Sequence, residues 1–582
     1  MIVYRDQRSR VDPHGLLLQL RSVASHSCVS VPDHDDAVEL VIETGVLESA
    51  IADSLFPDID GTHPLAQSLR QASVMAGHVL WHTWQGNPQQ ARQWCARLAV
   101  ALREVPDHQL PPTVQVSIIP EGYAYYAVYP EMYLEAAKRF YTQVGKCDAV
   151  CLGIRSIGAS LSAVVVAALE ELGCMVNSFT VRPRGHPFSR RPLLSEELAA
   201  QLREKPTAYF LLIDEGPGIS GSSLGGTAAL LQSWGIQDDH VVLFPSWQTD
   251  GAHLASQEAR QQWLLHPQLT VSFEEVWLDS ARLGSTFPGD FQDLSAGAWR
   301  QELYRDVAEY PAVHPQHERR KYLLTTPSPS GGARLLSFAG LGQRSLKKVE
   351  RLARLAEAGF TVGPEKVAHG FLLRPFVAGS PASTDLIDAE LLERAAAYLA
   401  HLSREHAAEP SVSDESLREM ITVNVAEGLH RPFEATLREV LPASGWVERP
   451  VALDGRMLVH EWVRTPREFL KLDAMDHHDD HFFPGCQDIA WDVAAAVFEL
   501  DLEEQSRSYF IARYRRLSGD RGIARRLHHY AIAYLSFRLG YATLATSVLG
   551  KTADGIRFTG QAQRYARLLA SELNNSPARW ND

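Results

Sequence analysis

The chain has 582 residues, which exceeds the usual size of a domain with a single hydrophobic core, so two or three domains are expected. Hydrophobic residues make up 45% and charged residues 22%, as in an ordinary soluble globular protein, and the net charge of −14 argues against general nucleic-acid binding. No apolar run is long enough for a membrane span, no export signal opens the chain, and its six cysteines form no CxxC pair. We therefore expect reduced thiols and a cytoplasmic location without membrane contact.

Residues 1–110 are predicted to form a helical extension that caps the next domain. In the segments 38–56 and 63–84, apolar residues recur every three or four positions, which on a helix makes one buried stripe. The histidines of this region are interpreted as capping or core-edge groups and not as metal ligands: His26, His63, His78 and His82.

The segment 111–275 is predicted to be an α/β domain. It begins with an alternating strand, Thr113 to Ile119, and residues 120–140 then contain five tyrosines before a helix. A tyrosine ring with a polar tip suits the wall of a base or sugar site, and Glu121 and Tyr125 are the first candidates. The same cluster is equally consistent with a strand and helix that dock on the core.

Two further features of this domain indicate an anion site. The turn at 153–160 follows an apolar strand and opens a helix, the place where doubly wound sheets bind ligands. Downstream, residues 182–191 carry four arginines among Pro and Gly. This basic segment is either a solvated loop or a flap that supplies cations to a pyrophosphate group.

The strongest signal is the stretch 207–228. A buried strand, Tyr209 to Ile213, ends in the acidic pair Asp214 and Glu215 and runs through a turn of glycines and serines into an apolar helix. Such a turn presents backbone N–H groups and the positive end of a helix dipole to an anion. The pattern predicts a phosphate cradle beside two carboxylates.

The run from Ile213 to Ser223 resembles the phosphoribosyl-pyrophosphate (PRPP) motif of the type I phosphoribosyltransferases, and the turn at 153–160 resembles the pyrophosphate loop of that family. The resemblance implies a doubly wound parallel sheet and a Mg²⁺-dependent enzyme that transfers a ribose 5-phosphate group, or releases it by phosphorolysis, from a nucleotide or phosphoribosyl substrate. It assigns catalysis to Asp214 and Glu215. It assigns phosphate and PRPP binding to Gly216, Gly218, Ser220, Gly221, Ser222 and Ser223, and pyrophosphate binding to Arg155, Ser156, Gly158, Arg182 and Arg184.

A second unit is expected after a linker at 276–332, where Pro and Gly cluster. Residues 333–582 resemble the aminoglycoside-phosphotransferase-like branch of the protein kinase fold. The match is clearest at Asp488 to Ala494, which fits the D-x-A-x-D-L-A helix start of that branch. The resemblance implies an α+β kinase-like domain with ATP as its ligand.

This second unit departs from its family at the catalytic loop. His460, Glu461 and Trp462 stand where the catalytic loop is expected, so its catalytic Asp is missing, and no metal-binding Asn follows. Glu461 is the alternative base, one position out of register. Asp473 fits the metal-binding Asp after a strand, and Lys471 could pair with it or contact a phosphate. The kinase-like site is thus predicted to comprise His460, Glu461, Lys471 and Asp473. A metal site of Asp473, His477 and Asp479 and a solvated acidic loop remain alternatives.

Together these features predict an α/β protein with a doubly wound, phosphoribosyltransferase-like domain behind a helical extension, followed by an α+β kinase-like domain. The leading hypothesis is a phosphoribosyltransferase. The alternatives are a small-molecule kinase and a catalytically degenerate nucleotide-binding sensor that acts with a protein partner. Residues 500–582 are predicted to be helical and buried, with His528 and His529 as packed polar residues.

Overall fold

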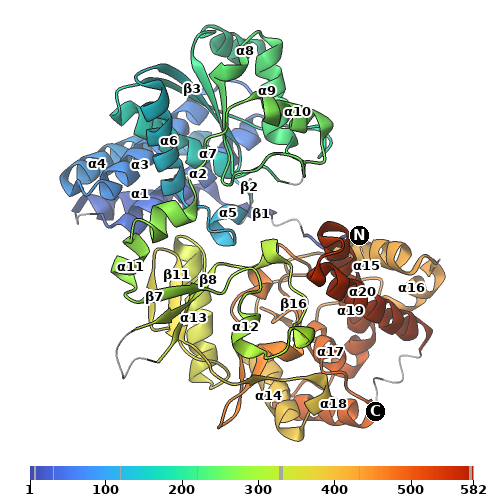
Figure 1. Cartoon of the computed structure of the whole chain (residues 1–582). Coiled ribbons are helices and arrows are strands. Elements are labelled where there is room, and N and C mark those ends of the chain that lie inside the picture. The colour runs from blue at the N-terminus through green and yellow to red at the C-terminus, as the bar shows by residue number, and fades with distance from the viewer. Residues whose placement is uncertain are drawn as a thin grey trace.

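The computed structural model describes residues 1–5, 8–29, 32–117, 120–218, 220–326, 332–431, 433–575 and 580. Two halves lie against each other (Figure 1): the helical extension and a parallel sheet occupy the upper half of that view, and an antiparallel sheet with a helical lobe occupies the lower half.

The extension is built from four helices and a small two-stranded sheet. Asp33 accepts a hydrogen bond of 2.7 Å from the N–H of Asp36 and so caps the second helix, whose apolar side faces the core, as the periodicity predicts. The elements are β1 (Arg8–Val11), α1 (Pro13–Val29), α2 (His34–Leu55), α3 (Pro64–Trp84), α4 (Pro88–Glu104) and β2 (Val114–Ser117), with β1 antiparallel to β2.

The expected parallel sheet is present, with four strands in the order β4-β3-β5-β6. Its side chains alternate between two cores: Cys151 of β3 belongs to the core shared with α7, while Val150 and Leu152 belong to the core under α8, α9 and α10. Helices thus cover both faces, and all carboxyl ends of the strands meet at one edge. The elements are α5 (Glu121–Ala124), α6 (Pro130–Val144), β3 (Asp148–Ile154), α7 (Ile157–Glu171), β4 (Met175–Val181), α8 (Glu196–Arg203), β5 (Tyr209–Ile213), α9 (Ser222–Ser233), β6 (Val241–Phe244) and α10 (Gln257–Leu265).

A five-stranded antiparallel sheet follows, in the order β10-β11-β9-β8-β7. Two of these strands, β7 and β8, lie inside the range 276–332 that the sequence predicts as a linker. The apolar run of β8 pairs with β9 despite the Pro and Gly residues around it, so this range is sheet as well as connection. The elements are α11 (Arg282–Thr286), β7 (Asp290–Asp293), α12 (Arg300–Leu303), β8 (Lys321–Thr325), β9 (Arg334–Phe338), α13 (Gln343–Glu357), β10 (Lys366–Ala368) and β11 (Phe371–Pro375).

The remaining chain forms a helical lobe with short strands. The lobe also takes in the start of the chain, since Val3 belongs to its core and the N–H of Ile2 donates 2.6 Å to Oδ1 of Asn424. The elements are β12 (Ser380–Pro381), α14 (Ala389–Glu405), α15 (Asp414–Leu429), α16 (Glu434–Val440), β13 (Pro450–Val451), β14 (Trp462–Arg464), β15 (Phe469–Lys471), β16 (Gln487–Asp488), α17 (Ala490–Glu499), α18 (Glu504–Ser518), α19 (Ile523–Leu549) and α20 (Ala553–Asn574).

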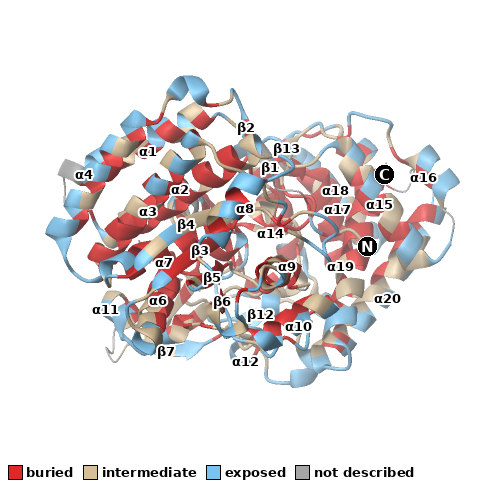
Figure 2. Ribbon diagram, turned by 90° about the horizontal axis from the view of Figure 1, so that it is seen from above, coloured by how far each residue is buried: buried red, intermediate tan, exposed pale blue. Residues whose placement is uncertain are grey.

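Among the described residues, α19 is the one helix that is long and apolar enough to cross a membrane by length and composition. Of its most apolar window, 61% is buried inside the protein. A helix that is apolar on all sides is expected to be buried in this way. Figure 2 shows buried residues through the interior of both halves and exposed ones on outer helices such as α16. One core joins the extension, the parallel sheet and the antiparallel sheet, so the two halves pack directly on each other.

Candidate active site at the sheet edge and a second pocket

A cavity of about 1200 Å³ lies at the carboxyl edge of the parallel sheet. We call it the sheet-edge cavity. Its walls come from the turns after β3 and β5, the segment after β4, and parts of the extension. It gathers residues that the sequence separates by more than sixty positions. The sequence-predicted residues that line it are Arg155, Ser156, Arg182, Arg184, Asp214, Glu215, Gly216, Gly218, Ser220, Gly221, Ser222 and Ser223.

The acidic pair stands at the end of β5. The N–H of Glu215 donates 2.9 Å to Oδ1 of Asp214, and the hydroxyl of Tyr133 donates 2.6 Å to the Asp214 carbonyl, which fixes the turn. Burial raises the pKa of Asp214 to about 6. Burial and the neighbouring charge of Asp214 raise the pKa of Glu215 to about 8. A bound cation or hydroxyl donors would stabilise the ionised form of these carboxyls.

The turn after the acidic pair leads directly into α9. Gly221 precedes the helix with φ +65°, and a Cβ there would lie 2.9 Å from the Leu254 side chain, so the turn requires glycine. The N-cap residue Gly221 has no side chain, and the Ser220 hydroxyl accepts 3.3 Å from the N–H of Ser222, the first residue of α9. The N–H groups of this first turn begin at the cavity wall. The Ser222 hydroxyl donates 2.6 Å to the carbonyl of Pro187 and so joins the turn to the basic segment.

Carboxylates of the extension hold the arginines of the predicted pyrophosphate site. Arg155 is 3% exposed and pairs with Asp53 at 2.9 Å and with the buried Asp60. Arg182 pairs with Asp53, and Arg184 reaches Asp60 at 3.2 Å. Two carboxylates therefore compensate most of the charge of three guanidinium groups.

Arg190 remains exposed on the same segment, and its guanidinium lies 3.4 Å from Oγ of Ser223. Asp53 of α2 and Asp60 of the loop after it anchor the start of the basic segment, which is therefore not a plain solvated loop. A flap that supplies cations to a pyrophosphate group stays a prediction.

Two candidates from the sequence lie elsewhere. Gly158 is absent from the described cavity wall, and a Cβ on it would come within 2.5 Å of the Ile213 carbonyl, so it serves the packing of α7 on β5. The other is Tyr125, which is buried and absent from the described cavity wall; Tyr123, Tyr129 and Tyr133 of the same cluster belong to the core. Glu121 does line the cavity, but no aromatic side chain is among the wall residues that the structure describes.

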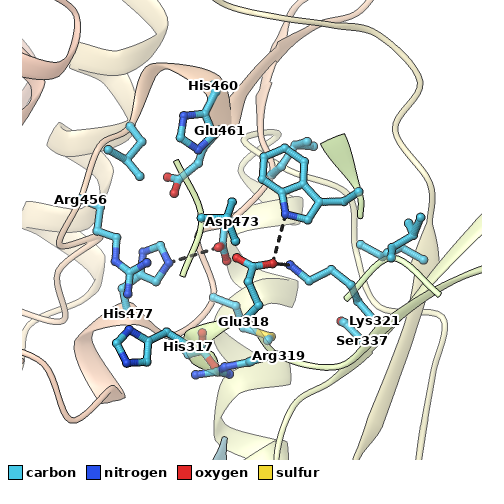
Figure 3. A pocket seen from close by; sticks show the side chains of 18 of the residues that line it. His317, Glu318, Arg319, Lys321, Ser337, Arg456, His460, Glu461, Asp473 and His477 are labelled. Carbon is cyan, nitrogen blue, oxygen red and sulfur yellow. Dashed lines mark hydrogen bonds and ion pairs between the residues drawn. The ribbon is translucent and has the colours of Figure 1, made fainter. Parts of the chain in front are cut away.

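A second cavity of about 220 Å³, the C-terminal pocket, lies between the antiparallel sheet and the helical lobe. Four sequence-predicted residues line it: His460, Glu461 and Asp473 of the kinase-like site, and His477 of the predicted metal site. In Figure 3 the His477 ring points at Asp473, and Lys321 points at Glu318. The His477 Nε2 to Asp473 Oδ2 distance is 3.2 Å, and the Lys321 to Glu318 distance is 2.8 Å.

The carboxylates Asp473 and Glu318 of this pocket are paired with His477 and Lys321. The side chain of Asp473 is 54% exposed, so the desolvation that opposes its ionisation is only partial, and the charge and hydrogen bond of His477 hold the pKa of this carboxyl well below its usual range. Burial lowers the pKa of His460 to about 3, so this ring is neutral at physiological pH. The indole of Trp299 donates 3.1 Å to Glu318 and stacks on His460, with ring centroids 5.9 Å apart.

The predicted metal trio is not gathered. Asp473 and His477 meet, whereas the Asp479 carboxylate lies 4.0 Å from Nζ of Lys348 and is not part of the described pocket wall. Within the described part of the chain, the group whose ligand atoms converge within 4.8 Å is Asp454, Glu461 and His477.

Asp454 is the residue that sequence reasoning missed. It follows β13, and its own N–H and that of Gly455 donate 2.7 Å and 2.8 Å to the carboxylate of Asp492. The D-x-A-x-D match at 488–494 identifies Asp492 from the sequence. It does not indicate that Asp454 binds Asp492, which only the fold shows. Asp454 is fully buried and bound to Lys471, and neither lines the described pocket.

No protein-family model and no curated protein matches this chain. Among solved structures, a choline kinase from Streptococcus pneumoniae is 15% identical, with a TM-score of 0.34, and covers 50% of this chain and 98% of its own. A choline/ethanolamine kinase family protein from Mesorhizobium loti is 14% identical, with a TM-score of 0.32, and covers 51% of this chain and 97% of its own.

A spectinomycin phosphotransferase, solved with ADP and spectinomycin, is 9% identical, with a TM-score of 0.31, and covers 44% of this chain and 89% of its own. About half of this chain is thus similar to small-molecule kinases and phosphotransferases. At these identities and TM-scores the likeness does not tell what either cavity binds.

Proposed function

We propose that the sheet-edge cavity is the active site of a phosphoribosyltransferase-type enzyme that acts on PRPP or a related nucleotide. The observation that carries the proposal is the convergence of an acidic pair, a Gly/Ser turn at a helix N-terminus and a basic segment around one cavity. This combination suits a ligand with a terminal phosphate, a ribose and a pyrophosphate group.

Each group has a role in breaking the bond between the anomeric carbon and pyrophosphate. The backbone and hydroxyl donors of Ser220, Ser222 and Ser223 would hold the 5-phosphate. Asp214 and Glu215 would hold the ribose hydroxyls and stabilise the positive charge that develops on the ring. The new bond forms from the anomeric carbon to the acceptor as pyrophosphate leaves. In the reverse direction pyrophosphate, and in phosphorolysis phosphate, attacks that carbon as the base leaves, so no side-chain nucleophile is required.

The acidic pair also fits Mg²⁺, because carboxylate oxygens are hard ligands. The raised pKa values show that the two negative charges lack a compensating cation, which Mg²⁺ would supply. When bound, Mg²⁺ would supply charge neutralisation to the pyrophosphate. Arg190 would add the exposed guanidinium of the basic segment.

The experiment incubates the protein with PRPP, Mg²⁺ and a panel of acceptors and measures pyrophosphate release. Release by the wild type and its loss in the Asp214→Asn, Glu215→Gln double variant are expected. The exposed Asp239→Asn serves as the matched control. Equal release from the double variant, or none from the wild type with any acceptor, contradicts the proposal.

A small-molecule kinase is the second candidate. The C-terminal pocket combines a carboxylate at a strand end, Asp473, with the ring of Trp299, a suitable wall for a nucleotide. Asp454, a further carboxylate of this region, is fully buried against Lys471 and does not line the described pocket, so as it stands it cannot act as a base on a ligand there.

ATP turnover tests this candidate. Phosphate transfer that disappears in Asp473→Ala and survives loss of the Asp214 and Glu215 pair supports the kinase. Saturable nucleotide binding without turnover supports a sensor, and a stable protein partner on pull-down would place that sensor in a complex.

A further inference from the structure

The Lys471 ammonium sits at the centre of a ring of oxygens behind the C-terminal pocket. Its Nζ lies 3.0 Å from Oδ2 of Asp454, 2.5 Å from Oε2 of Glu461 and 2.9 Å from the carbonyl of Asp473. The side chains of Lys471 and Asp454 are 0% exposed. An ammonium has three N–H donors, and here each has an oxygen acceptor.

Asp454 and His477, which lie beside Lys471, already use their ligand atoms within the protein. The Tyr398 hydroxyl donates 2.9 Å to Oδ2 of Asp454, and the N–H of Met457 donates 3.0 Å to its Oδ1. His477 uses Nδ1 toward the Asp454 carbonyl at 2.8 Å and Nε2 toward Asp473. In the group that converges within 4.8 Å, Asp454 and His477 thus already use their ligand atoms within the protein, and Glu461 uses Oε2 for Lys471.

Hard oxygen ligands around one point are what a divalent cation takes. We propose that the Lys471 ammonium occupies this cation position, so that the Asp454, Glu461 and His477 group takes no divalent ion in the native protein. Unlike a bound metal ion, the Lys471 ammonium is covalently attached to the chain, so it cannot exchange with solvent or dissociate with a ligand. The C-terminal pocket then binds whatever ligand it takes without a metal at these acids, whether or not the sheet-edge cavity is a phosphoribosyltransferase site.

The fold holds Lys471 in place independently of any ligand. Lys471 pairs with Trp462 across β14 and β15, and its N–H donates 2.9 Å to the carbonyl of Phe360. Burial disfavours the ammonium, but the charges of Asp454 and Glu461 raise the pKa of Lys471 above its ordinary value. The cation is thus present throughout the physiological pH range.

Mn²⁺ binding, followed by electron paramagnetic resonance, tests the proposal. The parent protein carries Asp214→Asn and Glu215→Gln, which removes the acidic pair of the other cavity. We expect Lys471→Met in this parent to gain one Mn²⁺ ion per chain, and Glu461→Gln in addition to abolish that ion. Lys471→Arg, which keeps a cation, is the matched control and should gain none.

A measurement that needs no Lys471 variant guards against misfolding. Asp454→Asn in the same parent should leave Mn²⁺ binding unchanged, since these acids hold no ion in the native protein. Mn²⁺ that the parent binds and that Asp454→Asn or Glu461→Gln removes would overturn the proposal. A folded Lys471→Met variant without a new ion would overturn it as well.

Discussion

The backbone N–H of Gly122 donates a hydrogen bond of 2.9 Å to Oε2 of Glu215. This contact joins α5 to the acidic pair across 93 positions of sequence. In the same segment, the Tyr125 hydroxyl donates to the carbonyl of Asp479, in the loop beside the C-terminal pocket. One short helix therefore touches both the sheet-edge cavity and the loop behind the second pocket.

Gly122→Ala should weaken ligand binding in the sheet-edge cavity. A Cβ at this position would lie 2.5 Å from Oε2 of Glu215 and 2.7 Å from Cδ1 of Ile157, so the carboxylate must move. We expect PRPP affinity in the presence of Mg²⁺ to fall about tenfold, or about 1.4 kcal/mol, by isothermal titration calorimetry. An unchanged affinity would show that Glu215 does not contact the ligand.

Binding of Mg²⁺ with PRPP should strengthen as pH rises from 6 to above 8. The pKa values of about 6 for Asp214 and about 8 for Glu215 mean that the pair gains its full charge only over this range. Glu215→Gln should bind more weakly and complete its pH dependence at lower pH, because only Asp214 then titrates. Calorimetry at several pH values checks this, and a flat profile in the wild type would contradict it.

The same two groups should make folding stability fall with pH. Their folded pKa values lie above the unfolded values of about 4, so their contribution is fully present below pH about 4. It is lost as pH rises through about 6 and about 8, because the unfolded state releases these protons first. Urea unfolding should show a smaller decline in the Asp214→Asn, Glu215→Gln variant than in the wild type.

Asp60→Asn should destabilise the protein by about 3 kcal/mol. Its carboxylate is 1% exposed and serves Arg155, Arg184 and, at 2.6 Å, the backbone N–H of Arg182. Removal of the charge leaves Asp53 as the one carboxylate that still pairs with Arg155 and Arg182, and it leaves Arg184 without its carboxylate partner. Breaking a buried ion pair costs about 3–5 kcal/mol, and the remaining Asp53 places the expected loss at the lower end. The exposed neighbour Asp58→Asn is the control, and equal midpoints in urea for both variants would refute the structural role of Asp60.

Gly158→Ala should cost about 1–3 kcal/mol through overpacking, since its Cβ would meet the Ile213 carbonyl at 2.5 Å. Gly560 in α20 has nothing within 4 Å of such a Cβ. Gly560→Ala should therefore leave stability unchanged or raise it. If thermal unfolding gave the two substitutions the same effect, the close approach of α7 to β5 would not be the reason for glycine at 158.

Much of the first half is readable from local pattern. The strand at Tyr209 to Ile213, the acids after it and the turn into α9 lie within fifteen residues, and a run of buried apolar residues followed by Gly and Ser has few other outcomes. The sequence alone therefore determined the buried strand, the position of Asp214 and Glu215 at its end, and the helix whose N-terminus faces them.

Only the tertiary structure decided which charges are free to act. The pattern of arginines at 182–191 does not reveal that Asp53 and Asp60, more than 120 positions away, hold two of them. Nor does the motif near 460 reveal that Lys471 is bound to Asp454 and Glu461. Periodicity and turn chemistry act over neighbouring residues, whereas an ion pair depends on which elements pack together, so the sequence names the candidate groups and the fold determines their partners.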